Sequence, residues 1–421
     1  MQQETLAIHA GYEKDQQLTM AVPLYQTTAF EFKSTEHGAN LFSLKELGNI
    51  YTRLSNPTTD ILEKRFAQVE GGAAALATAS GMSAIFYAIA NVCEAGDNVV
   101  TSDKLYGGTY SQFTHTLKRF GIEVRFFDTF NPSSAEELID ENTKAIFFES
   151  ISNPSIDVID VEAVVAIAKK HNIMSMVDNT VATPYLFKPF DWGIDISVHS
   201  TSKYTTGQGL AMGGMIVERE GLNEFIKGND RYKHFNEPDM SYHGLVYTDL
   251  EGFPAFCLRA RLGLMRDLGS VPAPFNSWLL IQGLETLGMR MREHSRNTLK
   301  IAQFLESCEG MTDVKYPLLE SDSNYTNAKK YLLDGASGLL SFDVGSYDKA
   351  QSIIDKLQIF SLVTNIGDTK SIVTHSASTT HQQLSDEDKK ACGVTPGLIR
   401  LSIGLENVDD LIADLAQAIA D

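Results

Sequence analysis

The segments KAIFF at residues 144–148, VEAVVAIAKKH at residues 161–171 and IMSMV at residues 173–177 decide the fold. The two outer segments are short and almost wholly apolar, whereas the middle segment repeats apolar residues at helical spacing. A strand that is apolar on both faces is typical of a parallel sheet with helices on both sides. We therefore expect a strand, a helix and a parallel neighbouring strand, in this order.

The same alternation extends to both sides of this unit. Further apolar runs predict strands at residues 98–101, 122–127 and 195–198, and helical patterns predict helices at residues 80–92 and 108–120. Another helix should begin at Thr58, because Pro57 directly before it is a favourable start signal. Residues 58–257 are thus predicted to form an α/β domain around a mostly parallel sheet.

The two ends of the chain have different patterns. Residues 1–57 show little helical period and contain Pro23, which predicts an extended arm. Residues 258–421 combine a long helical pattern at 276–304 with strand-like runs at 338–344 and 398–403 and helices at 349–357 and 408–420. We expect a smaller α+β domain there, since 421 residues are more than a single core usually organises.

Charge and composition exclude several classes of function. The chain has 35 basic and 54 acidic residues, a formal charge of −19, and such a surface repels nucleic acid and anionic lipid. No secretory signal and no run of roughly 18–20 apolar residues are visible. The four cysteines form no CxxC pair and the ten histidines have no metal-like spacing, so we expect a cytoplasmic protein without a metal site.

Asp178 ends the apolar run at residues 173–177. A carboxylate in such a place is costly unless a cation or a hydrogen-bond donor meets it. It could cap a helix or stand in a loop, but it could also face a protonated heterocyclic nitrogen at the carboxyl edge of the sheet, where ligands bind in open α/β folds.

The segment DISVHSTSKYTTGQG, residues 195–209, joins a strand end, hydroxyl side chains, Lys203 and a glycine-rich turn. Hydroxyls and open backbone amides suit a phosphate group. A lysine beside apolar surface and positive charge can act as an amine nucleophile, although most lone lysines are simply solvated surface groups.

The segment TASGMSA, residues 78–84, is a turn of small residues that opens a helix. Free N–H groups and the helix dipole at such a start attract an anion, but the same pattern is also a common packing device.

Lys203 with its neighbours resembles the attachment motif of the cysteine/methionine-metabolism pyridoxal-phosphate family. That family includes cystathionine synthases and lyases, methionine γ-lyase and the homoserine-ester sulfhydrylases. The resemblance extends from TLAIHAG at residues 5–11 to RLSIGLE at residues 400–406. It implies a fold type I pyridoxal-phosphate transferase with a seven-stranded-type, mostly parallel sheet, which assembles as a homotetramer, a dimer of dimers.

The resemblance also implies roles for the residues around the cofactor. Lys203 would attach pyridoxal 5'-phosphate and move protons, and Asp178 would pair with the ring nitrogen. Tyr106 would stack on the ring and act as a second catalytic residue, which assists either a proton transfer or the departure of the leaving group. Asn153 would lie near the cofactor's phenolic oxygen. The phosphate would be held by Ser80, Gly81, Met82, Ser200 and Ser202.

Other implied roles concern the neighbouring subunit and the substrate. Tyr51 and Arg53 would reach the phosphate bound by the neighbouring subunit, although alone they could be a packing aromatic and an exposed arm residue. Arg400 would clamp the substrate carboxylate, although its setting before an apolar strand also suits a salt bridge between domains. Ser361 and Asn365 would line the substrate pocket.

Departures from the family pattern bear on the reaction. Ser202 and Thr205 replace a threonine and an apolar residue, and Gly108 stands where methionine γ-lyases carry a cysteine. Residues 222–256, 361–371 and 376–381 resemble the sulfhydrylase branch. These features imply γ-replacement that converts O-acetylhomoserine and sulfide to homocysteine and acetate. Cystathionine γ-synthesis, γ-elimination and a non-catalytic docking role, for instance for a sulfur-carrier protein, stay as alternatives.

Overall fold

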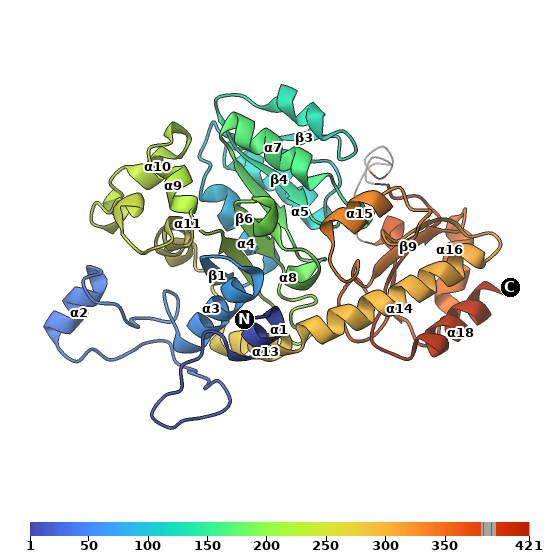
Figure 1. Ribbon diagram of the computed structural model, residues 1–421, viewed down its shortest axis with the longest axis horizontal. Coiled ribbons are helices and arrows are strands. Elements are labelled where there is room, and N and C mark those ends of the chain that lie inside the picture. Colours follow the sequence, from blue (N-terminus) through green and yellow to red (C-terminus); the bar gives the residue numbers. More distant parts are fainter. Residues whose placement is uncertain (380–381, 383–388, 390–392, 421) are drawn as a thin grey trace.

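The computed structural model describes residues 1–379, 382, 389 and 393–420. Its larger sheet has seven strands in the order β1-β7-β6-β5-β4-β2-β3 (Figure 1). Only β7 is antiparallel to its two neighbours in this sheet, so the predicted mostly parallel sheet is confirmed. The strands are β1 Ala74–Thr78, β2 Asn98–Ser102, β3 Glu123–Phe127, β4 Thr143–Glu149, β5 Met174–Asp178, β6 Ile196–His199 and β7 Gly214–Glu218.

Helices cover both faces of this sheet. Val177 of β5 belongs to a core with Phe66 of α3 (Pro57–Glu70) and Val164 of α7 (Val161–His171). The adjacent Met176 belongs to the opposite core, with Ile85 of α4 (Gly81–Ala90). Successive side chains of a strand point to opposite faces, and both faces here are buried, which explains the continuous apolar runs.

The two strands β1 and β7 were not predicted. The run at 74–78 consists mostly of alanine, which has a low preference for strands, and β7 begins with Gly214, directly after Gly213. Position 214 requires glycine, because a Cβ atom there would lie 2.2 Å from the carbonyl oxygen of Ser80. The predicted helix at 108–120 is α5 Gly107–Ser111, a π-helical turn at Gln112–Thr116 and α6 Leu117–Arg119.

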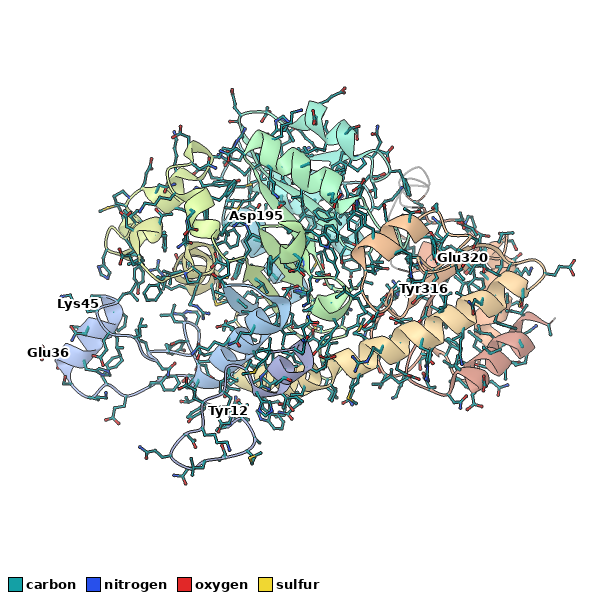
Figure 2. All side chains as sticks on the ribbon, in the orientation of Figure 1. Tyr12, Glu36, Lys45, Asp195, Tyr316 and Glu320 are labelled. Atoms are coloured by element: carbon teal, nitrogen blue, oxygen red, sulfur yellow. The ribbon has the colours of Figure 1, made fainter. Side chains whose placement is uncertain are left out.

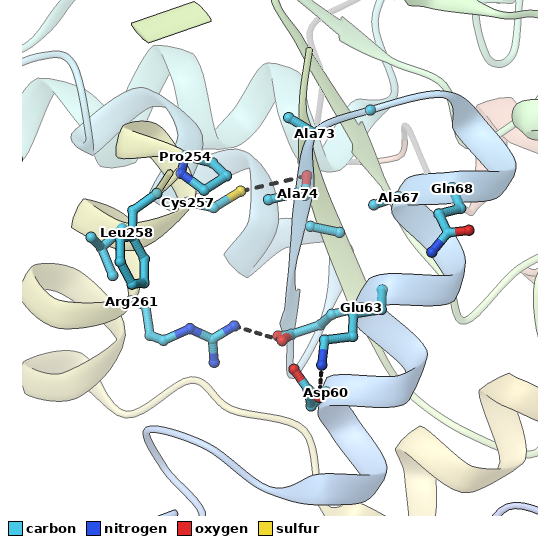
Figure 3. A pocket seen from close by; sticks show the side chains of 14 residues that line it. Asp60, Glu63, Ala67, Gln68, Ala73, Ala74, Pro254, Cys257, Leu258 and Arg261 are labelled. Carbon is cyan, nitrogen blue, oxygen red and sulfur yellow. Dashed lines mark hydrogen bonds and ion pairs between the residues drawn. The ribbon is translucent and has the colours of Figure 1, made fainter. Parts of the chain in front are cut away.

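The second sheet has five strands in the order β10-β11-β12-β9-β8. They are β8 Thr312–Lys315, β9 Leu339–Asp343, β10 Ser361–Leu362, β11 Ile372–His375 and β12 Leu398–Ser402. Helices α14 Leu287–Ser307, α16 Tyr347–Lys356 and α18 Val408–Ile419 lie beside it (Figure 1). Tyr316 lies close to α14 (Figure 2) and donates to the carbonyl oxygens of Ser295 and Ser337, each at 3.2 Å.

The long helix predicted at 276–304 is two helices. Helix α13 spans Pro274–Glu285 and α14 begins at Leu287, so the helix is interrupted at Thr286. Shorter helices connect the main elements: α8 Thr183–Leu186, α9 Leu222–Ile226, α10 Lys233–Asn236, α11 Ala255–Arg259, α12 Arg266–Leu268 and α15 Tyr325–Tyr331. No helix in the described residues is long and apolar enough to cross a membrane.

The arm at residues 1–57 was predicted to be extended, which is wrong for two segments. Helix α1 spans Gln3–His9, and α2 spans Thr35–Phe42 with Ser34 accepting a hydrogen bond from the N–H of His37. Helix α2 lies at the edge of the molecule, away from both sheets (Figure 1). Phe42 stays exposed there, as do Leu24 and Met20 elsewhere in the arm, so this segment has little core of its own.

Candidate active site

A cavity lies at the carboxyl edge of the larger sheet, where β1, β2, β4, β5 and β6 lead into its lining. This is the edge at which open α/β sheets bind ligands. The cavity brings together eleven of the site residues predicted from sequence: Ser80, Gly81, Met82, Tyr106, Asn153, Asp178, Ser200, Ser202, Lys203, Asn365 and Arg400.

Lys203 stands in the turn that follows β6. Ser202 anchors this turn, because its hydroxyl accepts from the N–H of Gly213 at 2.9 Å and donates to the carbonyl oxygen of the same residue at 3.1 Å. The Nζ atom of Lys203 donates to Oδ1 of Asn365 at 2.7 Å. Burial, and then the charge of Arg400, lowers the pKa of Lys203, which favours the neutral amine that a nucleophile or base requires.

Ser80 and Gly81 form the start of α4 at the cavity wall. The Ser80 hydroxyl accepts from the N–H of Ser83 at 3.2 Å and caps the helix. A Cβ atom at residue 81 would lie 2.5 Å from Cβ of Ser200, so only glycine lets the helix start approach this loop. Backbone N–H groups, hydroxyls and the helix dipole thus converge where an anion such as a phosphate would bind.

Asp178 is the last residue of β5 and faces the same cavity. Its Oδ1 atom accepts from the N–H of Thr180 at 2.9 Å. Burial raises the pKa of this carboxyl above its usual value. A cation at this point would therefore gain by pairing with it, as a protonated ring nitrogen would.

Arg400 lies in β12 and is 3% exposed. Its NH1 atom donates to Oδ1 of Asn153 at 2.9 Å, and NH2 donates to the carbonyl oxygen of Asn365 at 3.1 Å and to Oγ1 of Thr374 at 3.2 Å. Its Nε atom is buried with no hydrogen-bond partner among the described residues. Burial lowers the pKa of Arg400 to about 10. A guanidinium with a free buried donor suits a carboxylate ligand.

Tyr106 precedes α5, and its side chain is 41% exposed. A Cβ atom at Gly108 would lie 2.5 Å from Cε1 of the Tyr106 ring. The glycine therefore allows the ring to lie over the first turn of α5, and any larger residue at 108 must displace it.

Three predicted residues do not line the cavity. Ser361 lies exposed in β10, so the arrangement of the cavity gives its predicted substrate contact no support. Tyr51 and Arg53 belong to the arm, and the guanidinium carbon of Arg53 lies 5.2 Å from the centroid of the Tyr51 ring. Thr380, His381 and Cys392 lie outside the described residues.

The cavity also contains Thr364 and Ile366 of the run at 361–371, which resembles the sulfhydrylase branch, and three residues that were not predicted: Glu149, Thr180 and Met212. Glu149 had a sequence signal, because it ends the apolar run at 144–148 as Asp178 ends its own run. Thr180 and Met212 stand in loops without a comparable pattern.

The fold and this cavity define a class: enzymes that hold pyridoxal phosphate on a lysine at the edge of an α/β sheet. The model of the Cys/Met metabolism PLP-dependent enzyme family matches residues 4–420. The chain belongs to this family.

Relatives of similar length carry more specific names. An O-acetyl-L-homoserine sulfhydrylase of Leptospira meyeri is 48% identical over 99% of this chain and 96% of its own. A homocysteine/cysteine synthase of Kluyveromyces lactis is 45% identical over 99% and 97% of the two chains.

Solved structures of similar proteins support the assignment to this family. A putative O-acetylhomoserine (thiol)-lyase of Campylobacter jejuni, which contains N'-pyridoxyl-lysine-5'-monophosphate, is 54% identical and matches with a TM-score of 0.98 over 100% of both chains. A cystathionine gamma-lyase of Lactobacillus plantarum, complexed with L-serine, is 30% identical and has a TM-score of 0.85 over 100% of this chain and 99% of its own.

Proposed function

We propose that this protein is a pyridoxal-phosphate enzyme that exchanges the acetoxy group of O-acetylhomoserine for sulfide. The products are homocysteine and acetate, and the reaction serves methionine biosynthesis. The observation that carries the proposal is that Lys203 and Arg400 line the same cavity. Lys203 supplies an amine of lowered pKa, and Arg400 supplies a buried guanidinium with a free Nε. The names of relatives that are 42–48% identical support the choice of substrate.

The residues fit pyridoxal phosphate at this site. Ser200, Ser202 and the start of α4 at Ser80 would hold its phosphate, Lys203 its aldehyde carbon and Asp178 its ring nitrogen, with Tyr106 on the ring face. Bound there, the cofactor supplies an electron sink for the charge that proton removal leaves on the substrate.

The protein's own side chains perform the remaining steps. Arg400 binds the substrate carboxylate and orients the amino acid. Lys203 takes the α-proton as a neutral amine and then moves one β-proton, whose removal lets acetate leave the γ-carbon. Sulfide adds to the γ-carbon, and Lys203 returns the protons. One flexible amine with a lowered pKa suits several transfers.

Residue 108 favours a γ-replacement reaction over γ-elimination. A cysteine at residue 108, which methionine γ-lyases carry, would collide with the ring of Tyr106 as it lies here. Cystathionine γ-synthesis stays the closest alternative, because it would use the same cofactor residues with cysteine as the second substrate. A docking role without catalysis is the other alternative, and a lysine, an aspartate and an arginine that all face one cavity argue against it.

We propose that the active enzyme is an assembly of subunits. Tyr51 and Arg53 would act on the phosphate held by a neighbouring subunit, in a homotetramer built from two dimers. The buried free thiols Cys93 and Cys257 suit a reducing compartment, so we place the enzyme in the cytoplasm. A sulfur-carrier protein could replace free sulfide as the donor.

An assay of the pure protein with two esters and two nucleophiles tests the proposal. O-acetylhomoserine with sulfide should give homocysteine, whereas O-succinylhomoserine, cysteine as nucleophile, and methionine alone should give little product. Borohydride reduction should trap the cofactor on Lys203, and Lys203→Ala should lose both the trapped adduct and turnover. Efficient methionine breakdown without sulfide-dependent product would identify a lyase, and a stable protein partner with no turnover on any ester would identify a docking role.

A further inference from the structure

Glu149 is a cavity residue that the proposed mechanism does not use. It ends β4, it is 6% exposed and its two carboxyl oxygens bind different segments. Oε1 accepts from the N–H of Tyr106 at 2.6 Å, and Oε2 accepts from the N–H of Asn153 at 3.2 Å. A single buried carboxyl therefore joins two loops that are 43 and 4 residues away from it along the chain.

These two loops carry opposite parts of the cavity. Tyr106 precedes α5, and its aromatic ring forms part of the cavity wall. The absence of a side chain at Gly108 leaves room for this ring. Asn153 accepts from NH1 of Arg400 at 2.9 Å through its side chain, so its backbone position sets the orientation of the guanidinium. Glu149 therefore links the backbone of Tyr106 to the backbone of the residue whose side chain accepts from Arg400.

Glu149 also lies beside the other carboxyl of the cavity. Glu149 and Asp178 are register partners in β4 and β5, with both side chains in the lining. Burial, and then the charge of Asp178, raises the pKa of Glu149 well above its usual value. Adjacent buried carboxylates disfavour each other's charge, so a ring cation bound at Asp178 would stabilise the charged form of both groups.

We propose that Glu149 is a positioning residue of the cofactor site, which fixes the wall of Tyr106 relative to Asn153 and Arg400 through its two backbone hydrogen bonds. The inference rests on the proposed function in one respect, since it assumes that pyridoxal phosphate binds in this cavity. It does not depend on which ester or nucleophile reacts.

Glu149→Gln tests this, because glutamine keeps the size and one acceptor oxygen but cannot accept from both N–H groups. Glu218→Gln is a matched control: Glu218 also ends a strand, is buried, and accepts from two backbone N–H groups, those of Phe256 at 3.1 Å and Cys257 at 3.2 Å, but it does not line the cavity.

Both variants should lose thermal stability to a similar degree. Only Glu149→Gln should change the visible circular dichroism of the bound cofactor, which reports how the ring is held. It should also lower kcat/KM about ten- to a hundredfold, as small misplacements of reacting groups do. The control should retain the wild-type dichroism and kcat/KM. If Glu149→Gln matches the control in dichroism and kcat/KM, Glu149 has a purely structural role and the inference is wrong.

Glu149→Asp provides a second variant in case the glutamine protein does not fold. It keeps the carboxyl group but is one methylene shorter, so it too can reach only one of the two N–H groups. It should change the dichroism in the same way, and wild-type dichroism would overturn the inference. If the wild-type protein binds pyridoxal phosphate but turns over no homoserine ester, the proposed function fails, whereas the dichroism of these variants still decides the role of Glu149.

Discussion

The Nζ atom of Lys203 lies 2.7 Å from the Oδ1 atom of Asn365, a residue 162 positions later in the chain. This contact joins the turn after β6 to the loop between β10 and β11, so connections from the two sheets meet at the lysine. The carbonyl oxygen of Asn365 also accepts from Arg400, which links the amine to the guanidinium through one residue.

Asn365→Asp should move the pH dependence of catalysis. Burial and the Arg400 charge lower the pKa of Lys203 in the wild-type protein. A carboxylate at the position of Oδ1 would favour the protonated amine, and an opposite charge at this range shifts a pKa by about 1–3 units. The acidic limb of kcat against pH should therefore move to higher pH by a shift of this kind.

Asn365→Ala is the control for this experiment. It removes the hydrogen bond to Lys203 without adding charge, so it should lower kcat but leave the acidic limb near the wild-type position or below it. Equal profiles for the two variants would show that Lys203 is not the group that titrates in the rate.

The sequence predicted the larger sheet from strands that are buried on both faces, and it missed strands without that signal. Residues 144–148 and 173–177 are almost wholly apolar, whereas β1 is mostly alanine and β7 begins with Gly214 after Gly213. The two short helices of the arm were missed because they span only 7 and 8 residues, too few turns for a helical period to stand out.

Site residues could be predicted where a charged side chain occurs at or shortly after the end of an apolar strand. Asp178 is the last residue of β5 and Lys203 lies in the turn after β6, and the family resemblance supplied the more distant Arg400. The resemblance also assigned Ser361 to the pocket, but Ser361 lies in β10, and of these two residues only Asn365, in the loop after that strand, lines the cavity. Glu149 could have been found, because it ends its strand as Asp178 does.

Arg400→Lys should weaken substrate binding more than cofactor binding. The guanidinium offers several donors in one plane and has a free buried Nε, whereas a lysine ammonium cannot reproduce a two-point contact with a carboxylate. A lost hydrogen bond to a charged group costs roughly 1.5–3 kcal/mol, so kcat/KM should fall about tenfold or more. Titration of the cofactor absorbance should show nearly wild-type cofactor affinity, and a loss of kcat/KM explained by cofactor release would remove Arg400 from the substrate site.

Glu218 should make stability depend on pH in a definite direction. Burial raises its pKa from the usual 4.5 to about 8. The folded protein therefore keeps the Glu218 proton at pH values where the unfolded chain has lost it. The stabilisation is fully present below about pH 4.5 and is lost as the pH rises towards 8.

Comparison with Glu218→Gln isolates this effect. The free energy of unfolding of the wild type, relative to the variant, should fall by up to about 1.4 kcal/mol per pH unit between pH 5 and 8. Urea unfolding of both proteins across this range measures the difference, and a difference that is constant with pH would contradict the raised pKa.

Arg53→Ala and Lys203→Ala should complement each other if the active site is shared between subunits. Arg53 and Tyr51 do not line the cavity of their own chain, and the arm that carries them exposes Leu24 and Phe42. Such apolar side chains need a partner surface, and we propose that the neighbouring subunit provides it. Each variant alone should be nearly inactive, since every site in it contains one lesion.

Unfolding the two variants together and reassembling them creates mixed dimers in which one site carries both lesions and the other carries none. With random assembly, each site takes an intact lysine and an intact arm with a probability of one half each. The mixture should therefore recover about a quarter of the wild-type activity per site in a two-fold dimer. Lys203→Ala mixed with a second variant that also lacks Lys203 is the control and should recover nothing. Mixed oligomers that form without any gain over the parent variants would mean that Arg53 acts within its own subunit.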